Sequence, residues 1–403
     1  MSKLLMLTLL MLCFTAHASS QVVNHWRGPN RDGVFPDKNL LREWPAQGPE
    51  IAWVNSQLGL GYSSPTFANG KIYITGMENQ EGFVYTLSLD GKLMSKFSYG
   101  PERYDGYPGS RTSPAVVDNL LYMVNAFGRL ICMDLNTGGI KWAREFFSDF
   151  DGQNLRWGYT ENMIIDGDRI YCTPGGTKYN VVALNRFTGE PEWVSPGMGD
   201  LSAYCSPLLV THNGIRLLVT MMAKHIIGIN AANGELLWSY PYQNQRSIHP
   251  NTPIYSNGYL FGFSGYAFGG VKLKIAPDAR SVTKQWFNSS MDNQMGGAIL
   301  HNGYIYGSGD RNRFWYCIRW ETGEDVWQSS DLAKGTVIMA DGMLYIYSER
   351  GELALVEPSP DGLKIRSQTM VTHGSEQHWA HLVINNGVLY VRRGEALIAY
   401  RIK

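Results

Sequence analysis

Aromatic and basic side chains recur at one position along this chain, spaced about 45 residues apart. Each lies three residues before a proline, or before the residue that stands in its place, where a new strand is expected to begin. This column of positions reads Tyr62, Arg111, Tyr159, Tyr204, Pro250, Met295, Lys334 and Trp379. The connections that precede the column add Arg103, Tyr104, Tyr107, Arg156, Trp157, Arg246 and His249.

These side chains have the chemistry of a small-molecule site. Aromatic faces stack on sugar rings or other flat ligands, and arginine offers a rigid fork for carboxylate or phosphate. Repeats arranged around an axis would bring the column together at one mouth of a central channel. The alternative is that the side chains fill this channel and pack on one another. We predict a site for a neutral or anionic ligand, such as a glycan fragment, at Tyr62, Arg111, Tyr159, Tyr204, Met295, Lys334, Trp379, Arg156, Trp157 and His249.

Other patterns that could support chemistry are weaker. The segment from His373 to His381 holds three histidines and a glutamate, but a strand would send His378 and His381 to opposite faces. Asp134 to Gly138 begins like a calcium loop, yet no bidentate acid follows where such a loop needs one. We predict no metal site and name no catalytic residue. A carboxylate pair of the glycosidase kind stays open, because residues distant in sequence could meet in the fold.

The cysteines give no redox or metal signature. Those that follow the N-terminal segment are Cys132, Cys172, Cys205 and Cys317. No two are adjacent and no Cys-x-x-Cys occurs, so the zinc and c-type haem motifs are missing. We expect small, partly buried side chains in strands, with one disulfide among them left open.

The elements that would position the site form a repeat. Ser64-Pro65 leads through an apolar run to a turn at Asn69-Gly70 and then to an aromatic strand, and the same order recurs with turns near Gly167, Gly214, Gly258, Gly303, Gly342 and Gly387. In the second half of each unit, Asp134 to Gly138 leads to Trp142, and equivalent turns lead to Trp193, Trp238 and Trp327. Asn, Asp and Gly tolerate the positive φ of tight hairpins. Each unit therefore predicts four strands, with the tryptophans docking neighbouring units.

The units predict an all-β, eight-bladed propeller of four-stranded antiparallel blades. The last unit has only three strands, whereas residues 50–54 carry an outer strand and Trp53 with no strands before them. Pairing of these N- and C-terminal strands would close the ring and remove its open edges. Seven blades, with one unit misjudged, are the alternative. We place an irregular arm at 19–49 and a single propeller domain at 50–403.

Composition agrees with short strands and excludes several partners. The 403 residues include 44 glycines, only 17% are charged, and the formal net charge is zero. A neutral chain has no global basic surface for nucleic acid. Lys3, the apolar run 4–14 and Ala16-His17-Ala18 predict a signal peptide over 1–18 that is cleaved after Ala18, and no later run reaches the ~18 apolar residues of a membrane span. We expect an exported, periplasmic or secreted protein, without lipid on Cys13, because Leu12 precedes that cysteine.

The repeated Asp-x-x-Thr-Gly-x-x-x-Trp pattern resembles the pyrroloquinoline-quinone-type propeller repeat. The arm from Trp26 to Gly33 is similar to the opening segment of many secreted members. The repeat is shared by quinoprotein alcohol dehydrogenases and by a non-enzymatic outer-membrane-protein assembly lipoprotein. The dehydrogenases imply a quinone beneath a disulfide of two adjacent cysteines, and a calcium ion held by Glu, Asn and Asp. Neither a Cys-Cys pair nor a Cys-x-x-Cys-His haem motif occurs here.

We therefore expect a binding scaffold for a small molecule, a glycan or a cell-envelope protein, with no bound cofactor. Pyrroloquinoline quinone with calcium is the alternative cofactor. A quinone-dependent or carbohydrate- or polyol-active enzyme and an outer-membrane-protein assembly factor are the alternative functions.

Overall fold

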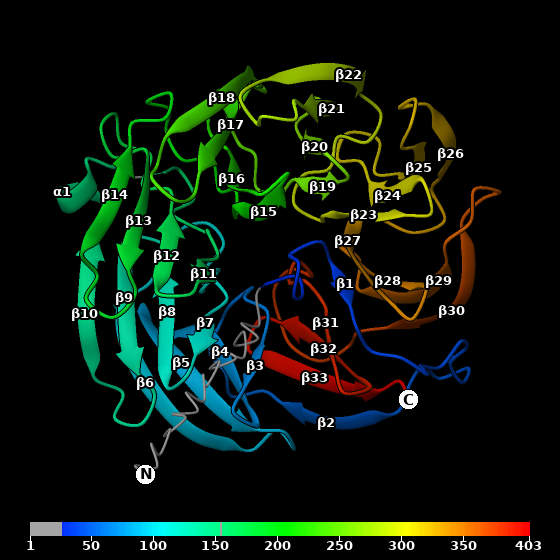
Figure 1. Cartoon of the computed structure of the whole chain (residues 1–403). Helices are drawn as coiled ribbons and strands as arrows, with labels where there is room; N and C mark the ends of the chain where they lie inside the picture. The colour runs from blue at the N-terminus through cyan, green and yellow to red at the C-terminus, as the bar shows by residue number, and fades with distance from the viewer. Residues whose placement is uncertain (1–25, 154) are drawn as a thin grey trace, which may run out of the picture.

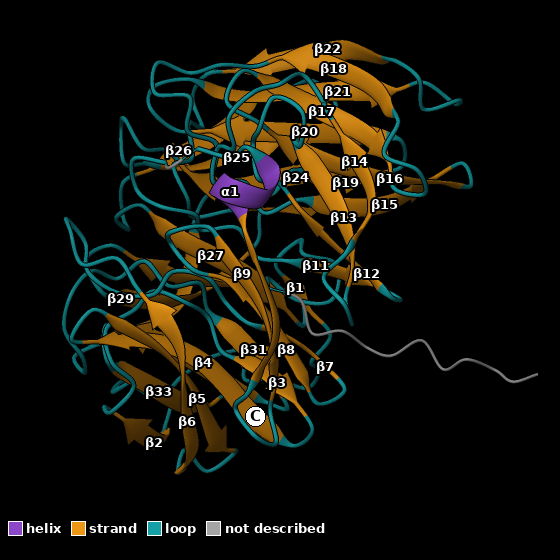
Figure 2. Cartoon of the chain, turned by 90° about the vertical axis from the view of Figure 1, so that its left-hand side faces the viewer, coloured by secondary structure: helices purple, strands orange, loops and turns teal. Residues whose placement is uncertain are grey.

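Antiparallel strands make up nearly all the regular structure in the computed structural model, which describes residues 26–153 and 155–403. The strands form eight sheets arranged as blades around a central axis (Figure 1). Figure 2 shows the strands from the side, with the short helix α1 (Phe146–Phe150) among them. Within the described ranges, no helix is long and apolar enough to cross a membrane. The predicted signal segment 1–18, its cleavage after Ala18 and Cys13 lie outside the described residues.

The first four blades follow one another along the chain. Blade 1 contains β3 (Thr66–Ala68), β4 (Lys71–Glu78), β5 (Glu81–Ser88) and β6 (Leu93–Pro101). Blade 2 contains β7 (Ala115–Val117), β8 (Leu120–Val124), β9 (Arg129–Asp134) and β10 (Ile140–Glu145). Blade 3 contains β11 (Ile164–Asp166), β12 (Arg169–Cys172), β13 (Val181–Asn185) and β14 (Pro191–Ser195). Blade 4 contains β15 (Leu208–His212), β16 (Ile215–Met221), β17 (His225–Asn230) and β18 (Leu236–Pro241).

The last four blades complete the ring. Blade 5 contains β19 (Ile254–Ser256), β20 (Tyr259–Ser264), β21 (Gly269–Ile275) and β22 (Val282–Asn288). Blade 6 contains β23 (Ala298–His301), β24 (Tyr304–Ser308), β25 (Trp315–Arg319) and β26 (Asp325–Ser329). Blade 7 contains β27 (Gly335–Ala340), β28 (Met343–Ser348), β29 (Glu352–Glu357) and β30 (Lys364–Met370). Blade 8 contains β31 (Val383–Asn385), β32 (Val388–Arg393), β33 (Ala396–Arg401) and, as its outer strand, β2 (Ile51–Asn55).

The ring closes by strand exchange between the two ends of the chain. Strand β2 pairs antiparallel with β33, with Trp53 opposite Ala399. The Trp53 ring then reaches blade 1, where its Nε1 donates a hydrogen bond to the Leu89 carbonyl at 3.0 Å. Eight blades and this closure confirm the fold predicted from the repeats, and the seven-bladed alternative is wrong.

The turn signals work as the sequence indicates. Most first hairpins place an Asn or Asp and a following Gly at positive φ, as Asn69 (51°) and Gly70 (68°) do. In the second halves, the glycine makes room for the tryptophan of the preceding blade: a Cβ on Gly189 would lie 2.7 Å from the Trp142 ring. Trp142 also donates to the Arg186 carbonyl at 3.0 Å. The tryptophans therefore dock one blade on the next, as predicted, and bury apolar area there.

The N-terminal arm crosses the centre of the ring. Strand β1 (Val34–Phe35) adds to blade 7 parallel to β27, with Val34 opposite Met339 (Figure 1). On one side the Arg27 guanidinium donates to the Val337 and Ala298 carbonyls at 3.2 and 3.3 Å. On the other side Arg31 donates to the carbonyls of Asn162 and Met163, just before β11, at 2.8 and 3.2 Å. Blades 3 and 7 face each other in an eight-bladed ring, so the arm is a strut across the channel.

Candidate functional site

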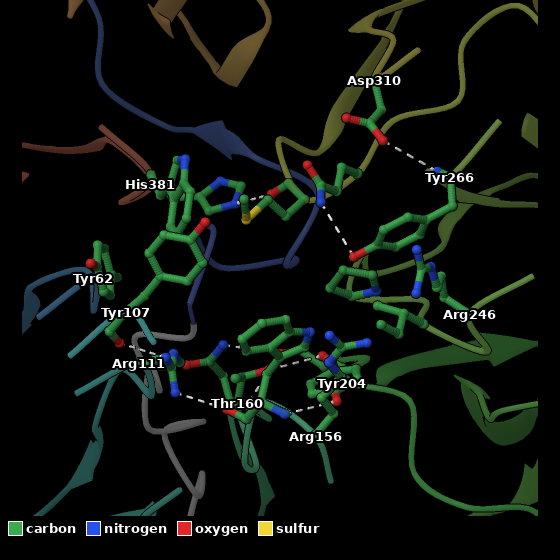
Figure 3. Close-up of a pocket in the computed structure, with 18 of the residues that line it drawn as sticks. Tyr62, Tyr107, Arg111, Arg156, Thr160, Tyr204, Arg246, Tyr266, Asp310 and His381 are labelled. Atoms are coloured by element: carbon green, nitrogen blue, oxygen red, sulfur yellow. Dashed lines mark hydrogen bonds between the residues drawn. The ribbon is translucent and has the colours of Figure 1, made fainter. Parts of the chain in front are cut away.

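A cavity of about 610 Å³ opens where the inner strands begin, above the N-terminal arm (Figure 3). Aromatic rings, arginines and a few neutral polar groups line most of it. The lining residues are Trp26, Tyr62, Tyr107, Arg111, Arg156, Trp157, Thr160, Asn162, Tyr204, Ser206, Arg246, Ile248, Pro250, Tyr266, Gln294, Met295, Asp310, Lys334, Glu349, Trp379 and His381. Side chains from every blade entry contribute, because each inner strand starts at the same end of the ring.

Eight of the ten predicted site residues line this cavity, and two do not. Those that come together are Tyr62, Arg111, Arg156, Trp157, Tyr204, Met295, Lys334 and Trp379. The two outside the lining are Tyr159 and His249, both of which are buried. The geometry thus assembles most of the column in one place, while ligand binding by these residues stays a prediction.

Tyr159 misses the cavity because the repeat shifts by one residue in blade 3. Backbone N–H groups at the blade entries bond in series: Ser113 donates to Asn162 Oδ1 at 2.7 Å, just as Ser64 donates to Ser113 Oγ at 2.8 Å. Asn162 therefore occupies the serine position, and Thr160 is the true column residue. Tyr159 instead packs edge-on against Phe146, with its hydroxyl on the Pro174 carbonyl at 2.6 Å.

His249 is held in the wall beside the cavity. It is fully buried, and its Nε2 bonds to the Ala223 carbonyl at 3.3 Å. Burial lowers the pKa of this imidazole to about 4, so it is neutral near pH 7. Its neighbours Ile248 and Pro250 face the cavity in its place.

Several lining residues are not predicted by the column. Asp310 and Glu349 follow the ends of the second strands of blades 6 and 7, at the same end of the ring as the column. Tyr266 takes a similar place after β20, at a positive φ of 64°. They could have been predicted from the sequence by looking for a polar residue one or two positions after the second strand of a blade.

One side of the cavity is rich in arginine. Arg111 donates to the carbonyls of Tyr107 and Trp157 at 2.6 and 2.8 Å, which fixes the aromatic connections on either side. The Arg156 guanidinium lies over the Trp157 ring at 5.0 Å. Arg246 comes from the connection before blade 5 (Figure 3). In the described parts of the chain, the guanidinium groups of Arg156 and Arg246 have no hydrogen bond or ion pair.

An ion cluster lies where blades 6 and 7 begin. Lys334 Nζ lies 2.6 Å from Asp310 Oδ1, 3.3 Å from Glu349 Oε1 and 2.9 Å from Gln294 Oε1. Gln294 also donates to the Tyr266 hydroxyl at 3.3 Å (Figure 3). The Lys334 side chain is only 12% exposed, so this pairing is better shielded from water than a surface salt bridge. The cluster brings two carboxylates together, with a cation between them.

Aromatic rings pack on one another along the cavity wall that the entries of blades 8, 1, 2 and 3 form. Trp379 lies 5.5 Å from Tyr62 and 4.6 Å from Tyr107, measured between ring centroids. Tyr107 in turn lies 6.1 Å from Trp157. The alternative of mutual packing therefore holds for these rings, but the packing does not fill the cavity. They form a rigid apolar wall with faces available to a ligand.

The inner end is closed by the arm and by His381. Trp26 packs edge-on against the His381 ring at 4.9 Å. Arg27 donates to His381 Nδ1 at 2.9 Å, and His381 Nε2 donates to the Met295 carbonyl at 2.9 Å. Burial, with the positive charge of Arg27, lowers the pKa of His381 to about 3. This histidine is neutral and protonated on Nε2, and its contacts leave no nitrogen for a metal.

A buried acid lies below the cavity, near the strut. Glu161 is fully buried, and its Oε2 accepts hydrogen bonds from Thr173 N–H and Oγ1 at 3.0 and 2.7 Å. Burial raises its pKa to about 8, although the Arg31 charge opposes this. Glu161 is therefore mainly protonated at pH 7 and does not neutralise Arg31.

The quinone and calcium implied by the resemblance do not fit these residues. Among the described residues, no three His, Cys, Asp or Glu side chains come together as a metal site. The four cysteines there are free and buried, and none of them is a lining residue of the cavity. The adjacent-cysteine disulfide that would cover a quinone thus has no counterpart, and no step is assigned to that cofactor.

Residues 80–329 match the family model described as outer membrane protein assembly factor BamB. The chain belongs to this family. The match confirms the propeller-repeat resemblance seen in the sequence.

Curated relatives match over shorter stretches. The outer membrane protein assembly factor BamB of Kangiella koreensis is 27% identical over 183 residues, which cover 45% of this chain and 43% of that protein. BamB of Salmonella typhimurium is 32% identical over 137 residues, 33% of this chain and 31% of that protein. The quinoprotein alcohol dehydrogenase PedH of Pseudomonas putida is 26% identical over 36% of this chain and 24% of its own length. The chain spans less than half the length of these relatives.

Solved structures show the same fold. BamB from Moraxella catarrhalis superposes with a TM-score of 0.64 at 13% identity, covering 88% of this chain and 99% of that chain. A quinohemoprotein alcohol dehydrogenase from Pseudomonas putida HK5 gives 0.62 at 13% identity, covering 95% and 80%. Both an assembly factor and an enzyme thus share this architecture, so function has to be argued from the site.

Proposed function

We propose that this protein is an exported binding propeller whose central cavity holds a small molecule with a flat or sugar-like ring. The observation that carries the proposal is the open volume of about 610 Å³, lined by rigid aromatic rings and arginines at the axis of the ring. This size and lining are typical of small-molecule sites.

The first experiment measures binding by calorimetry against a panel of mono- and oligosaccharides and aromatic acids. Trp379→Ala removes a ring from the cavity wall, and we expect affinity for any bound ligand to fall about tenfold. Phe287→Ala is the control, since Phe287 lies on the outer strand β22 and is 44% exposed. Equal ligand affinity of the wild type and Trp379→Ala would show that this part of the wall does not belong to the ligand site. No binding across the panel would leave the cavity without the proposed role.

Export is part of the proposal and has its own test. N-terminal sequencing of the protein recovered from the cell envelope should begin at Ser19, after cleavage behind Ala18. A protein that retains Met1, or that begins at a lipid-modified Cys13, would contradict it.

Family membership favours a second function, a role in outer-membrane-protein assembly, because the matching model and two relatives carry that description. A propeller would serve it by binding a cell-envelope protein. Affinity purification of the tagged full chain from solubilised envelopes would test it. Recovery of an outer-membrane protein with the wild type and equally with Trp379→Ala would support an assembly role separate from the cavity.

A further inference from the structure

The charges around the cavity are unevenly distributed. Four basic side chains line it, Arg111, Arg156, Arg246 and Lys334, against two acidic ones. Both acids, Asp310 and Glu349, pair with Lys334. The positive charge of the arginine side is therefore left without a counter-charge in the lining.

The arm adds net positive charge from below, because it carries two buried arginines against one acid, Asp32, whose charge acts on Arg27. The Arg27 and Arg31 guanidinium groups are buried in the channel and bond to carbonyls, as well as to His381 in the case of Arg27. The nearby Glu161 is mainly protonated at neutral pH because burial raises its pKa to about 8. Fixed cations behind a low-dielectric wall attract an anion into the concave site in front of them.

Arg156 and Arg246 are the groups free to bind that anion. Arg111 already uses both terminal nitrogens on carbonyls. Arg156 and Arg246 come from the connections before blades 3 and 5, and in the described chain neither guanidinium has a hydrogen bond or ion pair. Figure 3 shows both on the side of the pocket that holds Tyr204 and Tyr266. Two planar forks of this kind match the geometry of a carboxylate, sulfate or phosphate.

The remaining walls suit a hydroxylated ring. Arg156 lies over Trp157, so a ring that stacks on the exposed part of this indole has its substituent near the guanidinium. Across the cavity, Glu349 uses Oε1 on Lys334, and its Oε2 has no partner in the described chain. A carboxylate oxygen fixed in this way accepts a hydrogen bond from a sugar hydroxyl.

We infer that the ligand of this cavity is an acidic sugar, in which an oxyanion on the ring is bound by Arg156 and Arg246 while ring hydroxyls face Asp310 and Glu349. This inference rests on the proposed binding function and adds the chemical class of the ligand. Carboxylate and sulfate share the recognised chemistry, and the experiment separates them.

The experiment compares three probes of equal length by calorimetry: an oligogalacturonate, a carrageenan oligosaccharide, which carries sulfate and no carboxylate, and a neutral cello-oligosaccharide. We expect one of the acidic probes to bind about a hundredfold tighter than the neutral one, with affinity that falls as salt rises. Of the two acidic probes, the tighter one identifies the oxyanion. Equal binding of neutral and acidic probes would overturn the inference and leave the proposed function standing. Failure of all three, with other ring compounds bound, would likewise overturn it.

Variants locate the interaction. The double variant Arg156→Ala/Arg246→Ala should bind the acidic probe about a hundredfold more weakly than the wild type does. Its affinity then equals that for the neutral probe, because each charged hydrogen bond contributes a factor of ten or more to the affinity. Arg280→Ala/Arg366→Ala removes the same net charge from exposed outer positions and should leave affinity unchanged. Arg156→Lys/Arg246→Lys keeps the charge without the fork and should restore part of the loss. Equal losses in the cavity and control doubles would show a net-charge effect and contradict the assignment.

Discussion

Replacement of the buried acid Glu161 by glutamine tests the electrostatics beneath the cavity. The folded-state pKa of Glu161 is about 8, above its ordinary value of 4.5, because burial disfavours the charged form. A carboxyl with a raised folded pKa contributes its full stability below about pH 4.5 and loses that contribution as pH rises through about 8. Over this window the free energy of unfolding should fall by roughly 4 kcal/mol through this group alone.

Glutamine keeps the shape of the protonated acid and has no proton to lose. Glu161→Gln should therefore match the wild type at about pH 5 and exceed it by roughly 4 kcal/mol at about pH 8. Urea unfolding followed by tryptophan fluorescence at several pH values measures this difference. Glu43→Gln changes an exposed glutamate in the arm and is the control, which should follow the wild-type curve.

Parallel stability curves for wild type and Glu161→Gln would refute the reasoning. They would mean that Glu161 is ionised in the folded protein at neutral pH, paired with Arg31 across the channel. The positive charge beneath the cavity would then be neutralised, and the argument for an anionic ligand would lose that part of its support.

Three further predictions concern closure, the strut and the thiols. Trp53→Ala removes the ring that docks blade 8 on blade 1 and should lower the free energy of unfolding by about 3 kcal/mol, read from the urea midpoint; an unchanged midpoint would contradict strand closure as a stabilising feature. Arg31→Ala removes the strut's bonds to Asn162 and Met163, so proteolysis of the arm should become faster while the blades stay resistant; unchanged cleavage would show that the arm is held elsewhere. A thiol reagent should react with the native protein slowly and with the urea-unfolded protein at four further sites; fast native labelling would contradict burial of Cys132, Cys172, Cys205 and Cys317.

The fold could be predicted because its signals are local. Residues such as Asn69 and Gly70 adopt positive φ in most of the repeats, and second-turn glycines such as Gly189 mark the place where an aromatic ring of the preceding blade docks. The split last blade was also visible, since β2 carries Trp53 without partner strands before it. Periodic local signals add up over eight units, so one weak repeat does not change the count.

The site could be predicted in part. Most of the column converged because equivalent positions in a ring of blades share one radius and one height. Tyr159 lies outside the cavity lining because Asn162-Met163 replaces Ser-Pro in blade 3, and the hydrogen bond from Ser113 to Asn162 reveals the one-residue shift.

Two other features depend on contacts between distant segments and had no local signal. Lys334 meets Asp310 only when blades 6 and 7 are side by side, whereas Glu349 lies next to Lys334 across the β27–β28 hairpin. The burial of Arg27 and Arg31 could not be predicted, because no local pattern shows that the arm crosses the channel.

The most direct test of the central claim is a crystal structure of the protein with the tightest-binding acidic oligosaccharide. We predict density in the central cavity, with the ring against Trp157, its oxyanion between Arg156 and Arg246, and hydroxyls toward Glu349. Density for the sugar on the outer strands, with the cavity holding only solvent, would contradict the claim that the centre of the propeller is the functional site.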